Sequence, residues 1–576
     1  MGEFAQEGAD RPWLAGYPAG IPAEIDPSQF GSLTTMLERS FRDHAARSAF
    51  SCMGARLRYA DLDRHSAAVA AWLQAQGLRP GDRAAVMLPN VLQYPVVFMG
   101  ILRAGGVVVN VNPLYTPPEL VFQLADSGAE TIFVLENFAQ TVAAALPETP
   151  LRRVVVCSMG EMFSGIKGGA VDFVIRHVKR LVKPFSLPQS RTFRYRDVVR
   201  AGGGLPGSRV DSAPGDVAVL QYTGGTTGVP KGAMLTHRNL VANVLQSDAW
   251  YQPSLRRIPA GEAPVTVTAL PLYHIFALTS CALLSMRNGG SCVLIPNPRD
   301  LAALVAALRA ERFHIIPAVN TLFNALAHDA AFARLDFSSL VLCVGGGMAV
   351  QRAVAERWLA VTGRPICEGY GLSEASPVVS CNPTDTDAYN GSIGLPLPST
   401  EIAILDDAGG RLPIGAVGEI AARGPQVMAG YWNRPDETAK VLMADGFLRT
   451  GDIGTMDAQG YTRIVDRKKD MILVSGFNVY PSEVEEVAAG HPGVLECAAV
   501  GVPDGHSGEA VKLFVVRKDP ALTEGALQAF CRDRLAGYKR PKAIEFRTEL
   551  PKSNVGKILR RALRDAGASV GESVGA

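Results

Sequence analysis

Short runs of β-branched and other apolar residues recur along the chain and alternate with stretches of helical periodicity. The runs are Val107–Val111, Thr131–Leu135, Val154–Val156, Val217–Gln221, Val265–Leu270 and Leu340–Val344. Amphipathic stretches such as residues 31–47 and 67–76 have the spacing of helices. Strands that alternate with helices are typical of mostly parallel sheets covered by helices. The sequence therefore predicts an α/β fold with mostly parallel sheets.

Length and composition limit the function classes that need to be considered. A chain of 576 residues is too long for one ordinary core, so two or more domains are expected. A formal net charge of +2 gives no general attraction to nucleic acid, and no nucleic-acid partner is predicted. Nine cysteines without a Cys-x-x-Cys pair favour a reducing compartment. Because we find neither the apolar core of a signal peptide nor about eighteen consecutive apolar residues, we expect a cytoplasmic protein.

A glycine- and threonine-rich stretch, Tyr222–Lys231, directly follows one of the predicted strands. Glycine lets backbone N–H groups approach a ligand closely. The hydroxyls of three threonines and the charge of Lys231 would add donors for phosphate oxygens. The stretch differs from the common nucleotide P-loop, in which Gly-Lys-Ser/Thr leads directly into a helix. Taken alone, it indicates a polyphosphate ligand, and the alternative is a plain surface loop.

Further motifs with chemical potential lie farther along the chain. His274, in Ala269–Leu278, fits the wall of an apolar pocket, although a core histidine is an equal alternative. The triplet Gly345–Gly347 would let a flat ligand lie against the backbone. In Glu368–Glu374, a tyrosine between glycines suits stacking on a base, and the final carboxylate suits Mg²⁺. For each of these motifs the alternative is an ordinary turn or polar loop.

Residues 163–184 combine apolar side chains at helical spacing with basic side chains on the other side. The apolar set is Val171, Val174, Ile175, Val178, Leu181 and Val182, and the basic set is Lys167, Arg176, Lys179, Arg180 and Lys183. A basic amphipathic helix can lie in a membrane surface. The alternative is an ordinary surface helix packed on the protein.

The order and spacing of the motifs resemble those of the adenylate-forming superfamily, which comprises acyl-CoA synthetases, luciferases and peptide-synthetase adenylation domains. The matching stretches are Tyr222–Lys231, Leu270–His274, Glu368–Glu374, Gly451–Asp452, Asp466–Asn478 and Asn554–Lys557. Within the superfamily the chain looks most similar to bacterial long-chain fatty acid–CoA ligases. That finer resemblance rests on Asp445–Asp452, Val465–Pro481 and Leu550–Lys557, and the likeness extends from about Trp13 to about Arg564.

The resemblance implies a domain organisation and a reaction. Residues 1–468 would form a large multi-subdomain adenylation domain, and residues 469–576 a small mobile α+β lid hinged at Lys469. ATP and a long-chain fatty acid would give an acyl-adenylate and pyrophosphate. CoA would then displace AMP to give acyl-CoA, with Mg²⁺ assisting the phosphate chemistry. The resemblance also allows a homodimer, and the basic segment 163–184 allows peripheral contact with the inner face of the membrane.

The resemblance further implies a role for each motif residue. Catalysis would fall to Lys557, Glu374 and His274, and Mg²⁺ would be held by Thr226 and Glu374. ATP would be bound by Thr223, Gly224, Gly225, Thr226, Thr227, Gly228, Lys231, Gly345, Gly346, Gly347, Tyr370, Gly371, Ser373, Asp452 and Arg467. CoA would meet Ser475, Gly476, Phe477 and Asn478. The acyl pocket would be bordered by His274, Leu278, Asn320 and Thr321.

Two departures and several alternatives accompany this interpretation. Arg449 stands where related ligases often have Lys or His, which we interpret as a surface variation. Leu278 stands where some long-chain enzymes carry a gating tryptophan. The sequence therefore does not fix how the acyl tunnel is closed or which chain length is preferred. A fatty acyl-AMP ligase, a medium-chain or aryl acyl-CoA synthetase, a peptide-synthetase module and a non-catalytic scaffold are the alternatives. Acyl-AMP ligases carry an inserted segment, and we find none between Asp452 and Asn478. The presence of Lys557 and Glu374 disfavours a scaffold.

Overall fold

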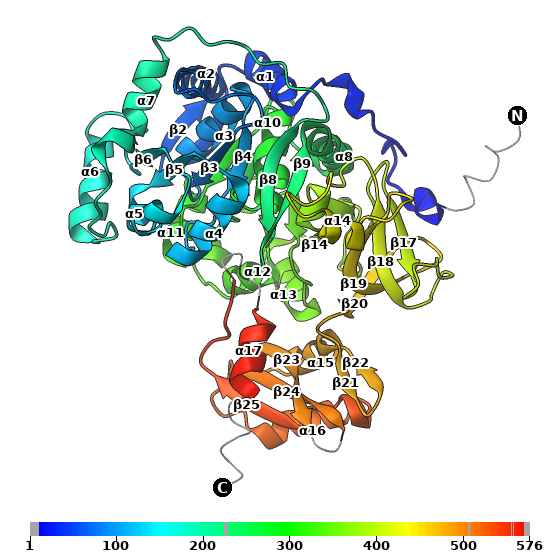
Figure 1. Ribbon diagram of the computed structural model, residues 1–576. Coiled ribbons are helices and arrows are strands. Elements are labelled where there is room, and N and C mark those ends of the chain that lie inside the picture. Colours follow the sequence, from blue (N-terminus) through cyan, green and yellow to red (C-terminus); the bar gives the residue numbers. More distant parts are fainter. Residues whose placement is uncertain (1–10, 224–228, 505–506, 554–555, 557, 569–576) are drawn as a thin grey trace, which may run out of the picture.

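A computed structural model of the protein describes residues 11–223, 229–504, 507–553, 556 and 558–568. The chain forms a large N-terminal part, in which helices surround the sheets, and a small C-terminal part that lies below it in Figure 1. The link between the two parts follows β20 (Thr462–Arg467). Among the described residues, no helix combines the length and the apolarity needed to cross a membrane.

The first large sheet has seven strands in the order β7-β6-β5-β3-β4-β8-β9. All neighbours pair in parallel except β8 and β9, which form an antiparallel hairpin. The strands are β3 (Arg83–Met87), β4 (Val107–Asn110), β5 (Thr131–Leu135), β6 (Arg153–Cys157), β7 (Thr192–Arg194), β8 (Val217–Thr223) and β9 (Lys231–Thr236). The helices that connect or flank them are α2 (Tyr59–Ala75), α3 (Gln93–Arg103), α4 (Pro117–Ser127), α5 (Ala139–Ala145), α6 (Ile166–Phe173) and α7 (Tyr195–Gly202).

The second large sheet has nine strands in the order β16-β15-β14-β13-β12-β10-β11-β1-β2. Its middle, from β14 to β1, is parallel, and antiparallel strands lie at both edges. The strands are β1 (Ser48–Cys52), β2 (Ala55–Arg58), β10 (Val265–Thr268), β11 (Ser291–Leu294), β12 (Ile315–Ala318), β13 (Leu342–Gly345), β14 (Ile366–Gly371), β15 (Val378–Cys381) and β16 (Leu395–Pro396). The accompanying helices are α1 (Leu33–Asp43), α8 (His237–Leu255), α9 (Ile275–Ala277), α10 (Leu284–Arg287), α11 (Leu301–Arg309), α12 (Asn320–Ala327) and α13 (Arg352–Thr362).

Two smaller sheets complete the chain. The first is antiparallel and contains β17 (Glu401–Leu405), β18 (Gly418–Arg423), β19 (Leu448–Met456) and β20, with α14 (Pro435–Val441) between β18 and β19. The C-terminal sheet contains β21 (Ile472–Val474), β22 (Phe477–Val479), β23 (Val494–Asp504), β24 (Gly508–Arg517) and β25 (Ala543–Arg547). Its helices are α15 (Pro481–Ala489), α16 (Glu524–Arg532) and α17 (Arg560–Ala568). Only β25 pairs in parallel there, so this part is α+β.

The predicted α/β fold is confirmed, and each of the six apolar runs corresponds to a strand. Their burial explains why the pattern could be recognised: β4 and β5 are buried at every residue, as expected for parallel strands covered on both faces. Hydrogen bonds from capping side chains determine the residue at which a helix begins. α8 begins after Thr236, whose hydroxyl accepts the N–H of Asn239 at 3.2 Å while the Asn239 side chain accepts the N–H of Thr236 at 2.9 Å. All nine cysteines are free and buried, so no disulfide is formed.

Candidate active site

Several motifs converge because parallel strands present their carboxyl ends at one edge of the nine-stranded sheet. The Gly345–Gly347 triplet follows β13, Tyr370 and Gly371 end β14, and His274 follows β10. Together they line a pocket with about 480 Å³ of empty space, part of it open to solvent. The predicted residues among its lining are His274, Gly345, Gly346, Gly347, Tyr370, Gly371 and Ser373. Clefts at the carboxyl ends of strands are the usual ligand sites of open α/β sheets.

The glycine triplet keeps this pocket open. A Cβ on Gly345 would lie 2.6 Å from a methyl group of Val350, and a Cβ on Gly346 would lie 3.0 Å from the Phe276 ring. Gly347 has a φ of +77°, a backbone conformation that favours glycine. The triplet therefore has little room for side chains, and its contact with a flat ligand stays a prediction.

A carboxylate and a guanidinium from the β19–β20 hairpin lie beside Tyr370, which lines the pocket. The Tyr370 hydroxyl donates to Oδ2 of Asp452 at 2.5 Å, and Nε of Arg467 lies 3.5 Å from Oδ1 of Asp452. The antiparallel register places Asp452 opposite Arg467. Burial of the ring, followed by the adjacent carboxylate, raises the pKa of Tyr370. The Asp452 carboxylate is thus positioned to accept hydrogen bonds, as required for recognition of a ribose.

Next to this pocket, Lys231 at the start of β9 is held by acidic and aromatic partners. Its Nζ forms an ion pair with the Glu437 carboxylate on α14 and lies 5.2 Å from the ring centroid of Tyr431. The Tyr431 hydroxyl donates to Oε1 of Glu374 at 2.7 Å. Hydrogen bonding from Lys231 lowers the pKa of Glu437 to about 2, and burial raises the pKa of Glu374. Two expected Mg²⁺- and phosphate-binding groups therefore meet here, and the predicted residues 224–228 lie outside the described residues.

Sequence reasoning missed two acidic residues that organise this region. Glu437 lies in the first turn of α14, and its partner Lys231 is 206 residues earlier in the chain. Asp126 near the end of α4 accepts from the Tyr222 hydroxyl at 2.7 Å and from the Arg434 guanidinium at 2.9 Å. No local pattern marks Asp126, because its role depends on contacts between distant segments.

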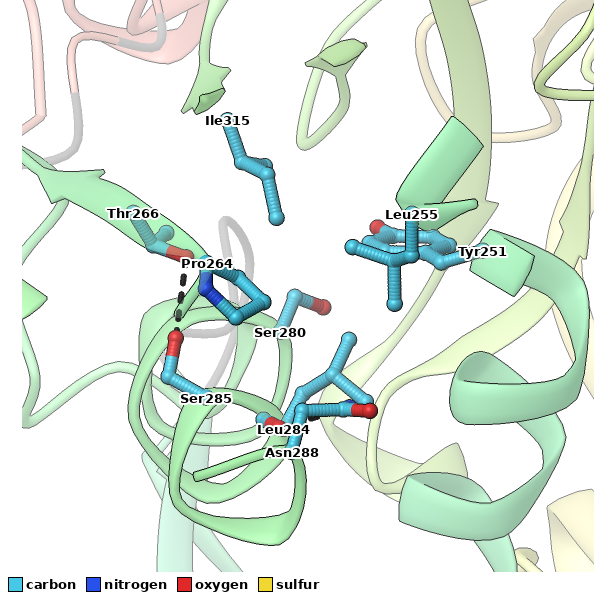
Figure 2. Close-up of a pocket in the computed structure, with 9 residues that line it drawn as sticks. All are labelled: Tyr251, Leu255, Pro264, Thr266, Ser280, Leu284, Ser285, Asn288 and Ile315. Carbon is cyan, nitrogen blue, oxygen red and sulfur yellow. Dashed lines mark hydrogen bonds between the residues drawn. The ribbon is translucent and has the colours of Figure 1, made fainter. Parts of the chain in front are cut away.

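A second, largely apolar pocket adjoins the first. It has about 240 Å³ of empty space, including space open to solvent. Figure 2 shows its lining, which is Tyr251, Leu255, Pro264, Thr266, Ser280, Leu284, Ser285, Asn288 and Ile315. Tyr251 of α8 and Ser280 line both pockets, so the two cavities meet at these side chains. Thr266 and Ser285 bond to each other at 2.9 Å, which satisfies two of the polar side chains in its lining.

Three residues expected at the acyl pocket are not among the residues that line these two cavities. Leu278 is buried, at 1% exposure, in the π-helical turn η7 (Leu278–Leu283) that also carries Ser280. The Asn320 side chain accepts the N–H of Gln351 at 3.0 Å. The Thr321 hydroxyl donates to the carbonyl of Gly556 at 3.3 Å. The assignment of these residues to the acyl pocket stays a prediction.

The contact between Thr321 and Gly556 brings the end of the C-terminal part onto the N-terminal part. Lys557 itself lies outside the described residues, and its neighbour Gly556 has a φ of +80°. By contrast, the predicted CoA-binding residues form the tip of the β21–β22 hairpin. Ser475 and Gly476 have positive φ values, and Phe477 is 57% exposed and stacks on Tyr538 at 4.9 Å. Of the segment that precedes α17, the structure therefore brings Gly556 to the N-terminal part.

The link between the two parts coincides with the predicted hinge. Arg560 of α17 lies 3.5 Å from Asp470, which ties Asp470 to the C-terminal part. Before the link, the Asp466 carboxylate accepts the N–H of Ser482 at 2.8 Å. Lys469 lies between these two anchored positions, and burial lowers the pKa of its ammonium group. A rotation at Lys469 would break the contact of Asp466 with Ser482 and leave that of Asp470 with Arg560 intact.

The interpretation of Arg449 as a surface variation is wrong. Its guanidinium is 2.6 Å from the Glu419 carboxylate, and only about a quarter of its side chain is exposed. The same carboxylate accepts the N–H of Gly451 at 3.1 Å. Arg449 therefore supports the turn that presents Asp452, a function that local sequence does not reveal.

The acidic residues fit a metal carried by a nucleotide better than a protein-built metal site. No cluster of three or more His, Cys, Asp or Glu side chains that could hold a metal occurs in the described part of the chain. Mg²⁺ typically takes one or two carboxylates and the oxygens of substrate phosphates. Glu374, half-buried beside the Lys231 region, matches that requirement.

Comparisons with known proteins agree with this geometry. The sequence pattern of the AMP-binding enzymes matches residues 37–432, and that of the AMP-binding enzyme C-terminal domain matches residues 483–557. The long-chain-fatty-acid–CoA ligase of Escherichia coli O6:H1 is 55% identical, with 96% of this chain and 98% of that protein covered. The ligase of the same name from Haemophilus influenzae is 49% identical over the same shares.

Solved structures give the same result at lower identity. The crystal structure of the anthranilate CoA ligase AuaEII in complex with anthranoyl-AMP superposes with a TM-score of 0.83 at 27% identity. The superposition covers 96% of this chain and all of that one. With matching family patterns, full-length relatives and a converging site, this chain belongs to the AMP-binding enzymes of the adenylate-forming superfamily.

Proposed function

We propose that the protein is a long-chain fatty acid–CoA ligase that converts ATP, a fatty acid and CoA into acyl-CoA, AMP and pyrophosphate. The observation that carries this proposal is a pocket lined by the nucleotide motifs that adjoins a second, largely apolar pocket at Tyr251 and Ser280. Such a junction suits a substrate with a carboxylate at one end and a hydrocarbon chain at the other. The relatives that match over nearly the whole chain bear the same activity in their names.

In the first half-reaction, a carboxylate oxygen of the fatty acid attacks the α-phosphorus of ATP, and the bond to the departing pyrophosphate breaks. Gly345–Gly347 and Tyr370 would hold the adenine, and Asp452 with Arg467 the ribose. Lys231 would turn from Glu437 to the phosphates. Mg²⁺, held by Glu374 and Thr226, would supply positive charge to the phosphate oxygens. Lys557 would stabilise the negative charge that develops at the α-phosphate.

His274 would orient the reacting carboxyl group at the junction of the pockets. Its Nδ1 accepts the N–H of Phe276 at 3.3 Å, so the proton of the neutral ring is on Nε2. An Nε2–H donor suits a carboxylate oxygen. The hydrocarbon chain would then pass Tyr251 and Ser280 into the second pocket.

In the second half-reaction, the CoA thiolate attacks the carbonyl carbon of the acyl-adenylate, and AMP leaves. We propose that residues 469–576 rotate about Lys469 between the two steps. The contact between Thr321 and Gly556 suits the first step, because Gly556 is the residue that precedes Lys557 in the chain. The rotation would replace Lys557 by Ser475–Asn478, which would guide the pantetheine chain to the adenylate.

CoA-dependent AMP release with short-, medium- and long-chain fatty acids and an aromatic acid tests the proposed activity. We expect the highest kcat/KM with long-chain acids. Accumulation of acyl-adenylate without thioester would instead indicate an acyl-AMP ligase. Preference for medium-chain or aromatic acids would replace the long-chain assignment, and silence with every acid would contradict an enzymatic role.

The substitution Lys557→Ala tests the two-step assignment. Adenylation should fall by roughly two to three orders of magnitude, the usual scale for one removed charge-stabilising group. Thioester formation from supplied acyl-adenylate should remain close to wild type. Equal loss in both steps would contradict the separate use of Lys557 in adenylation.

We also propose that the protein is a cytoplasmic homodimer. Cell fractionation would test its location, and light scattering of the purified protein would test its oligomeric state.

A further inference from the structure

Exposed apolar side chains concentrate on one short stretch, residues 166–185, which we call the α6 segment. It contains α6, the π-helical turn η5 (Val174–Val178) and the residues that follow. Six of the seventeen strongly exposed large apolar side chains among the described residues lie in it. They are Ile166 (92% exposed), Phe173 (59%), Val174, Val178 (65%), Leu181 (53%) and Phe185. Such a concentration marks an interaction surface more often than single exposed residues do.

The α6 segment attaches to the protein mainly through polar contacts. Arg176 binds both carboxylate oxygens of Glu136 at 2.8–3.0 Å, and Asp172 accepts the N–H of Gly160 at 2.7 Å. Ile175 is its one buried large apolar side chain among these residues. An ordinary surface helix packs its apolar face inward and exposes its charges. Here three charged side chains contact the protein, since Lys167 also donates to the carbonyl of Met53 at 2.7 Å, while apolar side chains face outward.

The outer surface of the α6 segment is also strongly basic. The segment contains five basic residues and one acidic residue, whereas the whole chain has a formal net charge of only +2. Lys179, Arg180 and Lys183 are exposed. The acidic residue, Asp172, is turned toward Gly160 and lies 3.9 Å from Arg176, so it does not offset those cations.

We propose that the α6 segment docks the protein on a membrane surface that contains anionic lipid. The outward apolar side chains would enter the boundary between headgroups and acyl chains, and the three exposed cations would face lipid phosphates. Docking requires no turnover, so it stands independently of the proposed ligase activity. It would place an enzyme for long-chain acids beside the phase in which such acids dissolve.

The charge of the segment also argues against a second copy of the chain as the occupant. In a symmetric dimer the same patch contacts itself, so Lys179, Arg180 and Lys183 would meet their own counterparts. Anionic lipid has the complementary charge. In addition, α6 lies at the outer edge of the N-terminal part, well away from the C-terminal strands, so docking leaves the lid unobstructed (Figure 1).

Sedimentation of the full-length protein with vesicles of phosphatidylcholine, with or without phosphatidylglycerol, tests the proposal. We expect binding to the anionic vesicles that weakens as salt is added. The double substitutions Phe173→Ser with Val178→Ser, and Lys179→Glu with Arg180→Glu, should each weaken binding by at least about tenfold. None of these residues belongs to the proposed catalytic site, so turnover of a dissolved short-chain acid should match wild type and report correct folding.

Matched controls come from other exposed side chains. Ile414 and Val417, in the loop before β18, are exposed to 53% and 52%, and Arg39 and Arg42 are exposed on α1. Serine at the first two positions and glutamate at the last two should leave vesicle binding unchanged. Undiminished binding by both segment variants would overturn the proposal. So would a segment variant that alters the mass seen by light scattering while vesicle binding persists, because a second copy would then cover the patch.

Discussion

The described part of the chain contains two π-helical turns of similar apolar content. One is surrounded by protein, and the other is largely exposed to solvent. In η7, between α9 and α10, all six residues are buried, and Ser280 reaches both pockets. In η5, which continues α6, Ile175 is buried, whereas Val174 and Val178 are 39% and 65% exposed. A π turn holds one more residue than an α turn and shifts the side chains that follow it. At η7 the shift serves a cavity, and at η5 it leaves apolar side chains outside.

The difference comes from what covers each turn. η7 lies between α8 and the nine-stranded sheet, so protein surrounds it except where Ser280 borders the two pockets. η5 is held from one side by the Arg176–Glu136 pair. Apolar composition alone therefore does not say whether a helix is interior, because burial depends on elements distant in sequence. The following predictions test this contrast, beginning with the largest expected effect.

Truncating one apolar side chain in each turn should distinguish the two turns most clearly, by the change in the free energy of unfolding. Leu283→Ala removes a fully buried side chain and should lower the free energy of unfolding by about 2–5 kcal/mol. Val178→Ala removes an exposed one and should change it by less than about 0.5 kcal/mol. Urea unfolding followed by circular dichroism measures both. Similar losses for the two variants would show that the α6 segment is packed against the protein in solution.

The second prediction concerns the cavity that η7 borders. Ser280→Phe would place a ring where the two pockets meet, and kcat/KM for long-chain acids should fall about 100-fold. Acids short enough to remain in the first pocket should lose much less. The control Ser280→Ala keeps the passage open and should preserve the long-chain preference. An equal loss for acids of every length would mean that the hydrocarbon chain does not pass Ser280.

Sequence reasoning recovered the parts of the fold and site that depend on local pattern. Buried parallel strands are apolar along their length, so Thr131–Leu135 was predicted with its observed bounds. Motif residues that follow strands, such as His274 and Tyr370, meet because parallel strands end at one edge. The ion pair of Lys231 with Glu437 and the outward orientation of Val178 have no local signal. They arise from segments that meet only in the folded chain.

The third prediction concerns how the free energy of unfolding depends on pH through one buried carboxyl group. On β14, at the pocket wall, burial raises the pKa of Glu368 to about 8 from its ordinary value of 4.5. The folded protein therefore keeps a proton that the unfolded chain releases, and stability should decline as pH rises from about 4.5 to 8. Between pH 5 and 7, wild type should lose about 2–2.5 kcal/mol more than Glu368→Gln, which stays neutral. Thermal unfolding at several pH values measures this difference, and parallel curves would contradict a buried protonated Glu368.

The smallest expected effect concerns the attachment of the α6 segment. Arg176→Gln would leave the buried Glu136 carboxylate without its guanidinium partner. The Arg176 side chain is 35% exposed, so solvent screens the pair and the loss should be about 1 kcal/mol. Because the segment contributes little apolar burial, the loss should appear mainly as local opening, measured by faster amide hydrogen exchange in residues 166–178 with little change elsewhere. Arg200→Gln, which removes a more exposed ion pair with Asp197, should leave exchange unchanged. Faster exchange throughout the protein would mean that Arg176 supports the core. Another contact would then hold the α6 segment with its apolar side chains outward.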